Sequence, residues 1–516
     1  MTEPSNQEPV IEFLSHGNAY GRRADNVTRI DTHASVVFLV GDRAYKLKRA
    51  IKFSYLDYST VAKREAMCRA EYELNRRTAS VLYRGVRKVT RDSAGDLVLD
   101  GAGAPVDWLL EMTRFSQDAL FDRLAERHAL TPALMRDLAD EIAAFHATAE
   151  PCDGDWATTM RRIVDENLAN LRRTGDVLDQ KKIADLAART DAALSRRAPA
   201  LATRPTRRCH GDLHLRNIAL IDGKPVLFDG IEFNDAFISI DPLYDLAFLL
   251  MDLDHRDLGA LANLVFNRYL DRTGDEAGLA LLPLYLSIRA GVRAHVSIAA
   301  IARQKNASEK RDLPAAASRY LDAALAFLDP TQPRLIAIGG FSGTGKSTVA
   351  HGLATNIAPK PGARVLRSDV IRKRLFGAAP ETRLPPSAYD RGTNERVYRA
   401  LYDAATTALG GGYTAIADAA FLDPAERATI AAVAARANVP FAGLWLEAPA
   451  ETLRQRIAAR HGDASDADRA VLDFQLSRNI GLLDWTRVDA KGSIKSVTDA
   501  ARRTLFSTGV PLESRR

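Results

Sequence analysis

The chain has 516 residues, of which 46% are apolar and 26% are charged, an ordinary composition for a folded protein that excludes a disordered or fibrous chain. At roughly 150 residues per domain, this length predicts about three structural units and excludes a single small domain. The 71 lysines and arginines exceed the 65 aspartates and glutamates by only six, so charge alone does not indicate a nucleic-acid partner.

The cysteines and the N-terminal residues indicate the cellular compartment of the protein. Cys68, Cys152 and Cys209 are far apart and form no CxxC or Cys/His cluster, which excludes a disulfide framework and a zinc site. The N-terminal MTEPSNQEPV carries acidic residues where a signal peptide carries basic ones, and no stretch approaches the ~20 apolar residues of a membrane span. We therefore expect a cytoplasmic protein with no membrane partner.

The first part of the chain is predicted to be a β-hairpin followed by helices. Residues 36–48 form two β runs joined at Gly41 and Asp42, and residues 60–81 have apolar side chains at helical spacing. Residues 131–200 and 255–328 are expected to be mostly helical. This order predicts an α+β region whose second part is helical.

A candidate catalytic motif lies between the two helical stretches. CHGDLHLRNIAL, residues 209–220, contains H-G-D-x-x-x-x-N, with the Asp-to-Asn spacing of the protein kinase catalytic loop. The apolar run PVLFD then places Asp229 twelve residues after Asn217. Phosphoryl transfer needs such a set, because Mg²⁺ bridges the triphosphate oxygens while a separate carboxylate orients the incoming hydroxyl. The pattern predicts Asp212 as the base and Asn217 and Asp229 as metal ligands.

These motifs resemble the aminoglycoside phosphotransferase family over most of residues 30–325. The segment IDPLYDLAF, with Asp241 and Asp245, also resembles the D-P-x-x-D-L-A segment of that family. The resemblance implies a bilobal, protein-kinase-like α+β fold with a mostly helical C-lobe. It further implies that Asp245 braces the catalytic loop.

The same resemblance implies a strand lysine on the α and β phosphates, paired with a helix glutamate. RAYK, residues 43–46, aligns with V-A-I-K, which makes Lys46 the expected lysine and Glu71 its expected partner. Lys48 lies on the same face of the strand, so it remains an alternative, as do Glu65 and Glu73 for the glutamate.

The chain departs from the protein kinase pattern in two places. No G-x-G-x-x-G precedes the hairpin, so THAS, residues 32–35, is the candidate phosphate loop, and DGI stands where protein kinases have DFG. These departures favour a small-molecule substrate over a protein substrate.

A second domain is predicted after a short linker. DPTQPR contains two prolines and no apolar periodicity, so we expect a linker at 329–333 between domains at 1–328 and 334–516. The runs LIAIGG, RVLRSD, TAIADAAF and FAGLWLEA then alternate with helical segments, which predicts the parallel α/β sheet of a P-loop NTPase.

GFSGTGKS, residues 340–347, matches G-x-x-x-x-G-K-[ST] at every fixed position, between a predicted strand and a predicted helix. In this motif backbone N–H groups surround phosphate oxygens, the lysine reaches the β and γ phosphates, and the final hydroxyl binds Mg²⁺. The predicted nucleotide-binding residues are Gly340, Ser342, Gly343, Thr344, Gly345, Lys346, Ser347 and Thr348, and Ser347 is also a predicted metal ligand.

Later segments supply candidate catalytic groups. Asp369 ends a strand run and Arg372 follows one helical turn on, so Asp369 could take the hydroxyl proton while Arg372 stabilises the transferred group. The alternative is an N-cap carboxylate with a solvated arginine. Asp418 ends the run TAIAD and is predicted to be the Mg²⁺ carboxylate, with a solvated strand end as the alternative.

Arg456 and Arg460 lie at i, i+4 on a predicted helix, before the polar stretch ARHGDASDAD. Lid arginines clamp phosphates during transfer, so both are candidate phosphate ligands on a lid. A solvated basic helix face is the alternative.

Residues 334–505 resemble the P-loop, AAA-type kinase-like ATPases grouped with polynucleotide kinase, zeta toxin and gluconate kinase. The whole chain resembles bacterial proteins that fuse a phosphotransferase-like domain to such a domain. The resemblance implies a bifunctional transferase that uses ATP and Mg²⁺ to phosphorylate small-molecule hydroxyls at two sites. One alternative is a single active N-terminal kinase regulated by a nucleotide-binding C-terminal ATPase. A third interpretation is a nucleic-acid end kinase. It is weaker, because the arginines are spread along helices and no pattern of aromatic and basic residues for a nucleic-acid groove is present.

Overall fold

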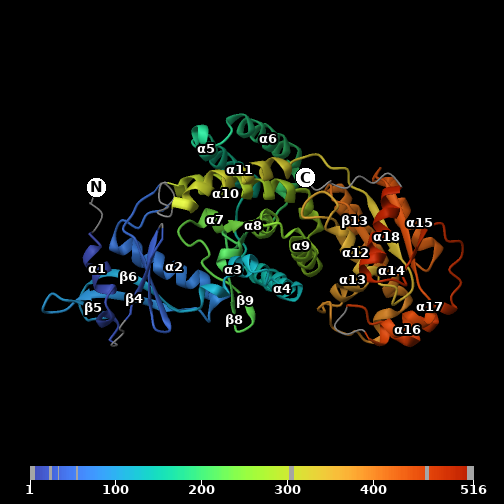
Figure 1. The fold of residues 1–516 in the computed structure, drawn as a ribbon, viewed down its shortest axis with the longest axis horizontal. Coiled ribbons are helices and arrows are strands. Elements are labelled where there is room, and N and C mark those ends of the chain that lie inside the picture. The colour runs from blue at the N-terminus through green and yellow to red at the C-terminus, as the bar shows by residue number, and fades with distance from the viewer. Residues whose placement is uncertain are drawn as a thin grey trace. The chain divides into compact units, whose positions relative to one another are not determined.

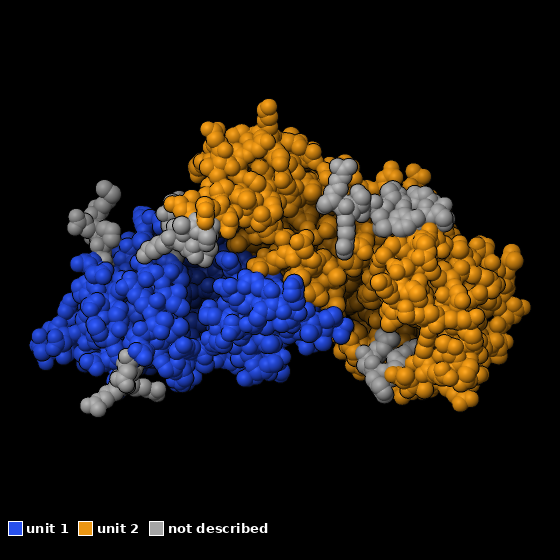
Figure 2. Space-filling view, in the orientation of Figure 1, with its two compact units in different colours: residues 1–141, 148–154, 205–245 blue, residues 142–147, 155–204, 246–516 orange. Residues whose placement is uncertain are grey.

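The structure, a computed structural model, describes residues 6–21, 26–32, 34–53, 56–301, 307–459 and 464–507. The chain divides into two compact units (Figure 2). The first comprises Met1–Glu141, Thr148–Gly154 and Pro205–Asp245, and the second comprises Ile142–Ala147, Asp155–Arg204 and Leu246–Arg516. This division groups many helices from before the expected linker with the residues that follow it. The limits 1–328 and 334–516 therefore stay predictions.

The first unit contains an antiparallel sheet in the order β1-β2-β3-β6-β4-β5. The expected hairpin is confirmed, because Val40 pairs with Arg43 across the turn at Gly41, whose φ of +57° suits a tight two-residue turn. The strands are β1 (Thr28–Asp31), β2 (Ser35–Val40), β3 (Arg43–Lys48), β4 (Tyr83–Arg91), β5 (Leu97–Leu99) and β6 (Pro105–Thr113).

Alternating side chains let this sheet bury both faces. On β6, Leu109 packs into a cluster with Leu14 of α1 (Glu8–Leu14), whereas Leu110 packs into a cluster with Cys68 of α2 (Val61–Ala79). The hydroxyl of Thr60 caps the N-terminus of α2 by accepting the Lys63 N–H. Helix α2 runs along the sheet (Figure 1), and its buried Glu71 bonds to Lys46 and Lys48 of β3.

The hairpin of β8 (Ile218–Ile221) and β9 (Lys224–Leu227) positions the candidate metal ligands. Its turn is Asp222-Gly223, where both residues have positive φ, as a type I′ turn requires. Ile218 pairs with Leu227, so Asn217 before one strand lies close to Asp229 after the other. The remaining elements that begin in this unit are η1 (Gly17–Tyr20), η2 (Gln117–Ala119), α3 (Phe121–Glu126), α4 (Pro132–Thr148), β7 (Arg207–Arg208), η4 (Leu215–Asn217), α7 (Asp235–Ile238), β10 (Ser239–Ile240) and α8 (Pro242–His255).

The second unit begins with helices, as the sequence predicts. Helices α10 and α11 lie side by side (Figure 1). Among the described residues, no helix is both long and apolar enough to cross a membrane. These elements are α5 (Trp156–Arg172), η3 (Gly175–Val177), α6 (Gln180–Ala202), α9 (Gly259–Thr273), η5 (Glu276–Ala280), α10 (Leu282–Ile301) and α11 (Ala307–Ala326).

The second unit also contains a parallel sheet in the order β12-β13-β11-β14-β15, which confirms the predicted α/β architecture. The edge strand β15 escaped prediction, because TRVD is largely exposed and has no apolar run. The strands are β11 (Leu335–Gly339), β12 (Arg364–Arg367), β13 (Ala415–Asp418), β14 (Phe441–Glu447) and β15 (Thr486–Asp489). The helices are α12 (Lys346–Ala354), α13 (Ser368–Leu375), η6 (Pro386–Tyr389), α14 (Arg391–Gly410), α15 (Pro424–Arg436), α16 (Ala450–Ala458), α17 (Arg469–Ser477) and α18 (Ile494–Ser507).

Helix α9 covers the other edge strand, β12. The Asn267 side chain pairs with the strand backbone: its Oδ1 accepts the Val365 N–H at 2.8 Å, and its Nδ2 donates to the Ala363 carbonyl at 3.1 Å. Arg364, 1% exposed, bonds to Asp271 at 2.7 Å and to Glu276 at 2.9 Å. The helical part and the P-loop part of this unit are therefore joined by a buried polar contact.

We expect Arg364→Met to lower the free energy of unfolding by about 3–5 kcal/mol, because it removes the cation between two buried carboxylates and leaves Glu276 only the longer pair with Arg374, at 3.7 Å. Urea denaturation of the full chain measures the loss. Arg268→Met, which removes a more exposed pair with Glu381, serves as the control and should cost about 0–1 kcal/mol. A fragment of residues 334–516 lacks α9 and exposes the edge strand β12, so it should be much less soluble than the full chain. Equal solubility would contradict this interpretation.

Candidate active sites

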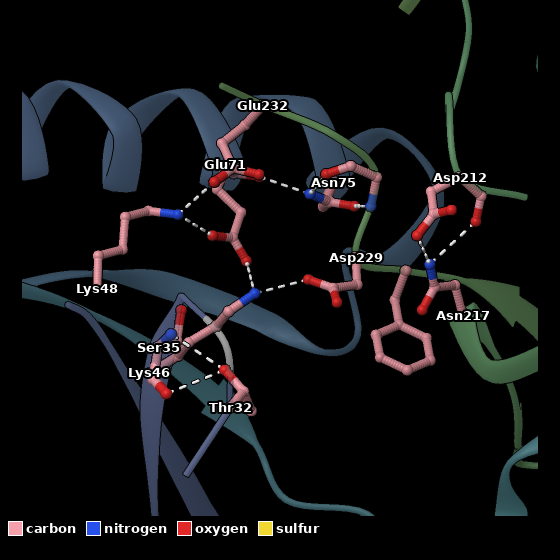
Figure 3. Close-up of polar contacts among 12 residues, drawn as sticks. Thr32, Ser35, Lys46, Lys48, Glu71, Asn75, Asp212, Asn217, Asp229 and Glu232 are labelled. Atoms are coloured by element: carbon pink, nitrogen blue, oxygen red, sulfur yellow. Dashed lines mark hydrogen bonds and ion pairs between the residues drawn. The ribbon is translucent and has the colours of Figure 1, made fainter. Parts of the chain in front are cut away.

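In the first unit, two lysines and three carboxylates form one cluster (Figure 3). Lys46 Nζ donates to Glu71 Oε1 at 2.8 Å and to Asp229 Oδ1 at 2.6 Å. Lys48 Nζ donates to Glu71 Oε2 at 2.6 Å and also bonds to Glu232. Because β3 side chains alternate, Lys46 and Lys48 share a face, and Glu71 on α2 bridges them.

The side chains of Lys46 and Lys48 differ in burial. The Lys48 side chain is 1% exposed, whereas those of Lys46 and Asp229 are 18% and 43% exposed. Burial opposes the charge of Lys46, but Asp229 and Glu71 hold the pKa of that ammonium well above its usual range. The more accessible lysine also contacts the candidate metal ligand, so Lys46 has the better position for a phosphate. The alternative glutamates pair elsewhere: Glu65 with Arg69, and Glu73 with Arg76.

The catalytic loop holds Asp212 and Asn217 together. Asn217 Nδ2 donates to Asp212 Oδ2 and to the Asp212 carbonyl, both at 2.9 Å. His210 lies behind them, with Nε2 donating to the Phe228 carbonyl at 2.9 Å and Nδ1 accepting the Asp212 N–H. Burial lowers the pKa of His210, which agrees with a neutral ring making both bonds. The loop thus presents the carboxylate of Asp212, 36% exposed, to solvent.

Asp245 braces this loop, as the resemblance implies. Its two oxygens accept the N–H groups of His210 and Gly211, each at 2.9 Å. Gly211 has φ of +84°, and a Cβ there would lie 2.9 Å from the Phe237 carbonyl, so only glycine fits. The turn and its carboxylate together set the position of Asp212.

Two further residues of this site were not predicted from the sequence. Asn75, one turn after Glu71 on α2, accepts the Gly230 N–H at 2.7 Å and so ties the helix to the segment after Asp229. Glu232 holds Lys48 and accepts the Tyr58 hydroxyl at 2.6 Å. Their only sequence signal is the spacing from Glu71 and from Asp229, which does not identify a partner without the fold.

Part of the candidate phosphate loop at 32–35 is described. The Thr32 hydroxyl donates to the Ser35 carbonyl at 2.9 Å and accepts the Ser35 N–H at 3.0 Å, which makes a turn before β2. His33 lies outside the described residues. Phosphate binding by this turn stays a prediction.

We expect the two lysines to respond differently to substitution. Lys48→Met leaves Glu71 and Glu232 buried with less compensating charge and should lower the free energy of unfolding by about 3–5 kcal/mol. Lys46→Met should instead weaken ATP binding, with a smaller loss of stability, because its surroundings are wetter. Thermal unfolding and ATP titration of both variants test this. Equal stability losses would contradict the assignment of Lys46 as the phosphate-positioning lysine.

The second unit contains a cavity of about 1030 Å³ that brings the P-loop together with most candidate groups of this half. Gly343 and Gly345 have φ of +86° and +88°, and α12 begins directly after them at Lys346. A Cβ on Gly343 would lie 2.8 Å from the Leu453 carbonyl of α16. The candidate residues that line the cavity are Ser342, Gly343, Thr344, Gly345, Lys346, Ser347, Thr348, Asp369, Arg372, Asp418 and Arg456. Gly340 precedes them, with φ of +140° and a Cβ position 2.4 Å from the Leu446 carbonyl.

Asp369 and Arg372 lie in the first two turns of α13, on the wall of this cavity. The N-cap residue of that helix is Arg367, so Asp369 is not the N-cap that the alternative interpretation required. Arg372 is 5% exposed and donates to the Ala388 carbonyl at 2.8 Å and to Asn394 Oδ1 at 2.7 Å, so it is not a solvated arginine. Its guanidinium lies 4.7 Å from the centre of the Tyr389 ring.

Asp418 is 4% exposed at the end of β13, which differs from the solvated strand end considered as its alternative. Arg367 Nε lies 3.5 Å from Asp418 Oδ2, a neighbour that was not predicted from the sequence. Arg456 bonds to the Lys491 and Gly492 carbonyls at 3.4 Å, whereas Arg460 lies outside the described residues. Phosphate binding by these two arginines stays a prediction.

The pH dependence of the second site should reflect Asp369. Burial raises the pKa of Asp369, and Arg367 opposes that rise. A base must be deprotonated, so turnover should fall as the pH decreases through this raised pKa, above the value near 3.9 of an ordinary aspartate. The measurement is the pH–rate profile of the Lys46→Ala variant, in which the first site is silenced, and the fall in rate at low pH is its acid limb. Arg367→Met should move that limb to higher pH; a limb that stays in place would exclude Asp369 as the titrating base.

Comparisons with known proteins agree with this description. Residues 99–282 match the model of the phosphotransferase enzyme family, and residues 335–479 match that of an AAA domain. Uncharacterized proteins of Mycobacterium tuberculosis H37Rv and of Mycobacterium bovis are each 30% identical to the chain over 479 residues, which cover 90% of this chain and 92% of theirs.

Solved structures show distant similarity to parts of the chain. An ethanolamine kinase of Plasmodium vivax covers 58% of this chain and 81% of its own, with 11% identity and a TM-score of 0.38. A sugar kinase of Janibacter sp. HTCC2649 covers 34% of this chain and 93% of its own, with 22% identity and a TM-score of 0.26.

The relatives extend over nearly the whole chain, and the two family models cover the H-G-D-x-x-x-x-N motif and the G-x-x-x-x-G-K-S motif. The chain therefore belongs to the same family as these mycobacterial proteins, joins a phosphotransferase domain of protein-kinase-like fold to a P-loop domain, and is an ATP-dependent phosphotransferase.

Proposed function

We propose that the chain carries two nucleotide sites, each of which transfers the γ-phosphoryl group of ATP to a hydroxyl of a small molecule. One observation carries this proposal: each site holds both a lysine suited to phosphate oxygens and a carboxylate suited to an acceptor hydroxyl. These are Lys46 and Asp212 in the first site, and Lys346 and Asp369 in the second.

The remaining residues take roles around these pairs. Glu71 holds Lys46 at 2.8 Å, and the hydrogen bonds of Arg372 hold it beside the cavity that contains Asp369. During transfer, Asp212 or Asp369 accepts the hydroxyl proton, and Arg372 stabilises charge on the moving group. The backbone of residues 340–348 surrounds the phosphates of the second nucleotide.

Mg²⁺ fits the oxygen donors at both sites. Asn217 uses its Nδ2 on Asp212, which leaves its Oδ1 as the acceptor that a hard cation prefers, with the carboxylate of Asp229 as a second donor. Ser347 and Asp418 line the second cavity with the same chemistry. When bound, Mg²⁺ would neutralise charge on the triphosphate oxygens.

A second candidate function keeps only the first site as a kinase and makes the P-loop half a regulatory ATPase. The contact of α9 with β12 favours it, because Asn267 and Arg364 join the helical part of the chain to a strand that leads directly to Asp369. A nucleic-acid end kinase remains the weaker alternative.

The test is incubation of the full chain with labelled ATP and a fractionated metabolite pool, alongside the Asp212→Ala and Lys346→Ala variants. Products lost in one variant only would assign each acceptor to its site. Products lost only with Asp212→Ala, together with ATP hydrolysis that depends on Lys346, would favour the regulatory alternative.

A further inference from the structure

The segment Ser465–Gln475 contacts both sides of the second cavity. It precedes and includes most of α17, and several of its side chains line the cavity, among them Phe474, which is 65% exposed. The contacts that connect the segment to the acceptor side and to the phosphate loop are made near its two ends, whereas Asp473 bonds to Arg454 of α16.

The first end holds the acceptor side. Ser465 and Asp369, the candidate base, both line the cavity, and the Ser465 hydroxyl opposes the rise in the pKa of Asp369. Asp466 Oδ2 accepts from three groups: Lys373 Nζ, the Tyr389 hydroxyl and the Leu384 N–H, the last at 3.0 Å.

The contact of Asp466 with Lys373 is ionic and largely buried. Its side chain is 11% exposed and that of Lys373 is 1% exposed. Burial opposes ionisation, but the hydrogen bonds from Lys373 and Tyr389 lower the pKa of Asp466, so the carboxylate stays charged. The ring of Tyr389 in turn packs on the guanidinium of Arg372. Asp466 is therefore connected to Arg372 through Tyr389.

The other end holds the phosphate loop. Gln475 Oε1 accepts the Ser342 N–H at 2.8 Å. Only the oxygen of the amide can accept this hydrogen, so the Nε2 donors of Gln475 are not used in this contact. Asp468 caps α17 by accepting the Val471 N–H, which keeps Gln475 on a regular helix behind Asp466.

We propose that Ser465–Gln475 is a bridge that couples the phosphate loop to the acceptor side of the second site, with Asp466 and Gln475 as its positioning residues. The inference rests on the proposed kinase activity of this site, and it names the device that aligns donor and acceptor. Phosphoryl transfer depends on such alignment, because displacement of a group by about 1 Å can cost roughly a hundredfold in rate.

Amide hydrogen exchange of the full chain tests the bridge without an acceptor. Gln475→Ala should increase exchange not only at Ser342, which it releases directly, but also at Leu384. Asp466→Asn should increase exchange at Ser342 as well as at Leu384, because coupling between two sites is reciprocal. Changes confined to the contact that each substitution removes would overturn the proposal.

Kinetics test the positioning role, in a chain whose first site is silenced by Lys46→Ala. Release of ADP from ATP should show a kcat lowered about tenfold by Asp466→Asn or Gln475→Ala, with KM for ATP within about twofold. The double variant should be no slower than the slower single variant, because each substitution alone already breaks the same connection. Independent effects that multiply to about a hundredfold would contradict coupling.

Matched control variants distinguish loss of the bridge from a general loss of structure. Asp473→Asn removes a carboxylate of α17 that bonds to Arg454, and Gln455→Ala removes an amide of α16 that bonds to Glu451. Both should leave exchange at Ser342 and Leu384 unchanged. Tyr389→Phe keeps the ring on Arg372 but loses the hydroxyl, so it should show part of the effect of Asp466→Asn.

Failure of the proposed kinase activity can be distinguished from failure of the bridge. If Asp369→Asn leaves turnover in the second site unchanged, the kinase assignment falls. Reciprocal exchange would then still establish the bridge, as a link between the phosphate loop and the cavity wall.

Discussion

Asp212→Ala is expected to lower transfer by the first site by a factor of roughly 10²–10⁴, the usual contribution of a general base. ATP affinity should stay within a few-fold, because the Asp212 side chain bonds to Asn217 and not to Lys46. Asp229→Ala should also weaken Mg²⁺-dependent ATP binding, because it removes a metal ligand and a partner of Lys46.

Calorimetric ATP titrations with and without Mg²⁺, together with transfer to acceptors of the first site, measure both variants. Asp235→Ala is the matched control, because Asp235 is a 78% exposed carboxylate of the same unit. Equal loss of nucleotide binding in the Asp212 and Asp229 variants, or full activity of Asp212→Ala, would show that these roles are wrong.

Lys346→Ala is expected to lower nucleotide turnover in the second site by a factor of roughly 10²–10³, because it removes a positive charge where the transition state develops negative charge. The activity of the first site should persist. Lys310→Ala, at an exposed lysine of α11, controls for the loss of charge.

Asp369→Asn then separates a kinase from a regulatory ATPase. A kinase needs this carboxylate for its acceptor, so transfer should be abolished while ATP binding and slow hydrolysis remain. Labelled products from the metabolite pool measure transfer. Full turnover in the Asp369→Asn variant, with any response of the first site to nucleotide intact, would leave only the regulatory alternative.

The motifs could be recognised in the sequence because their chemistry is local. Positive φ at Gly343 and Gly345 and the adjacent lysine are properties of neighbouring residues, and so is the Asp222-Gly223 turn that brings Asn217 near Asp229. Alternation of strands and helices likewise predicted the parallel sheet, except where the short, exposed β15 lacks an apolar pattern.

The choice between Lys46 and Lys48 depended on the tertiary structure. Both lie on one face of β3, and only the packing of α2 and of the segment after β9 shows that one meets Asp229 and the other Glu232. These partners are more than 180 residues away in the chain. No spacing rule relates residues so distant, because their contact follows from how whole elements pack.

The sequence by itself thus determined the two nucleotide motifs, the fold class and the kind of chemistry. The tertiary structure decided how the groups are held: Arg364 beneath α9, Asn75 on Gly230, and Asp466 and Gln475 at the two ends of one segment. The physical reason is that backbone conformation and side-chain periodicity act over a few residues, whereas the partner of a buried charge or amide is set by long-range packing.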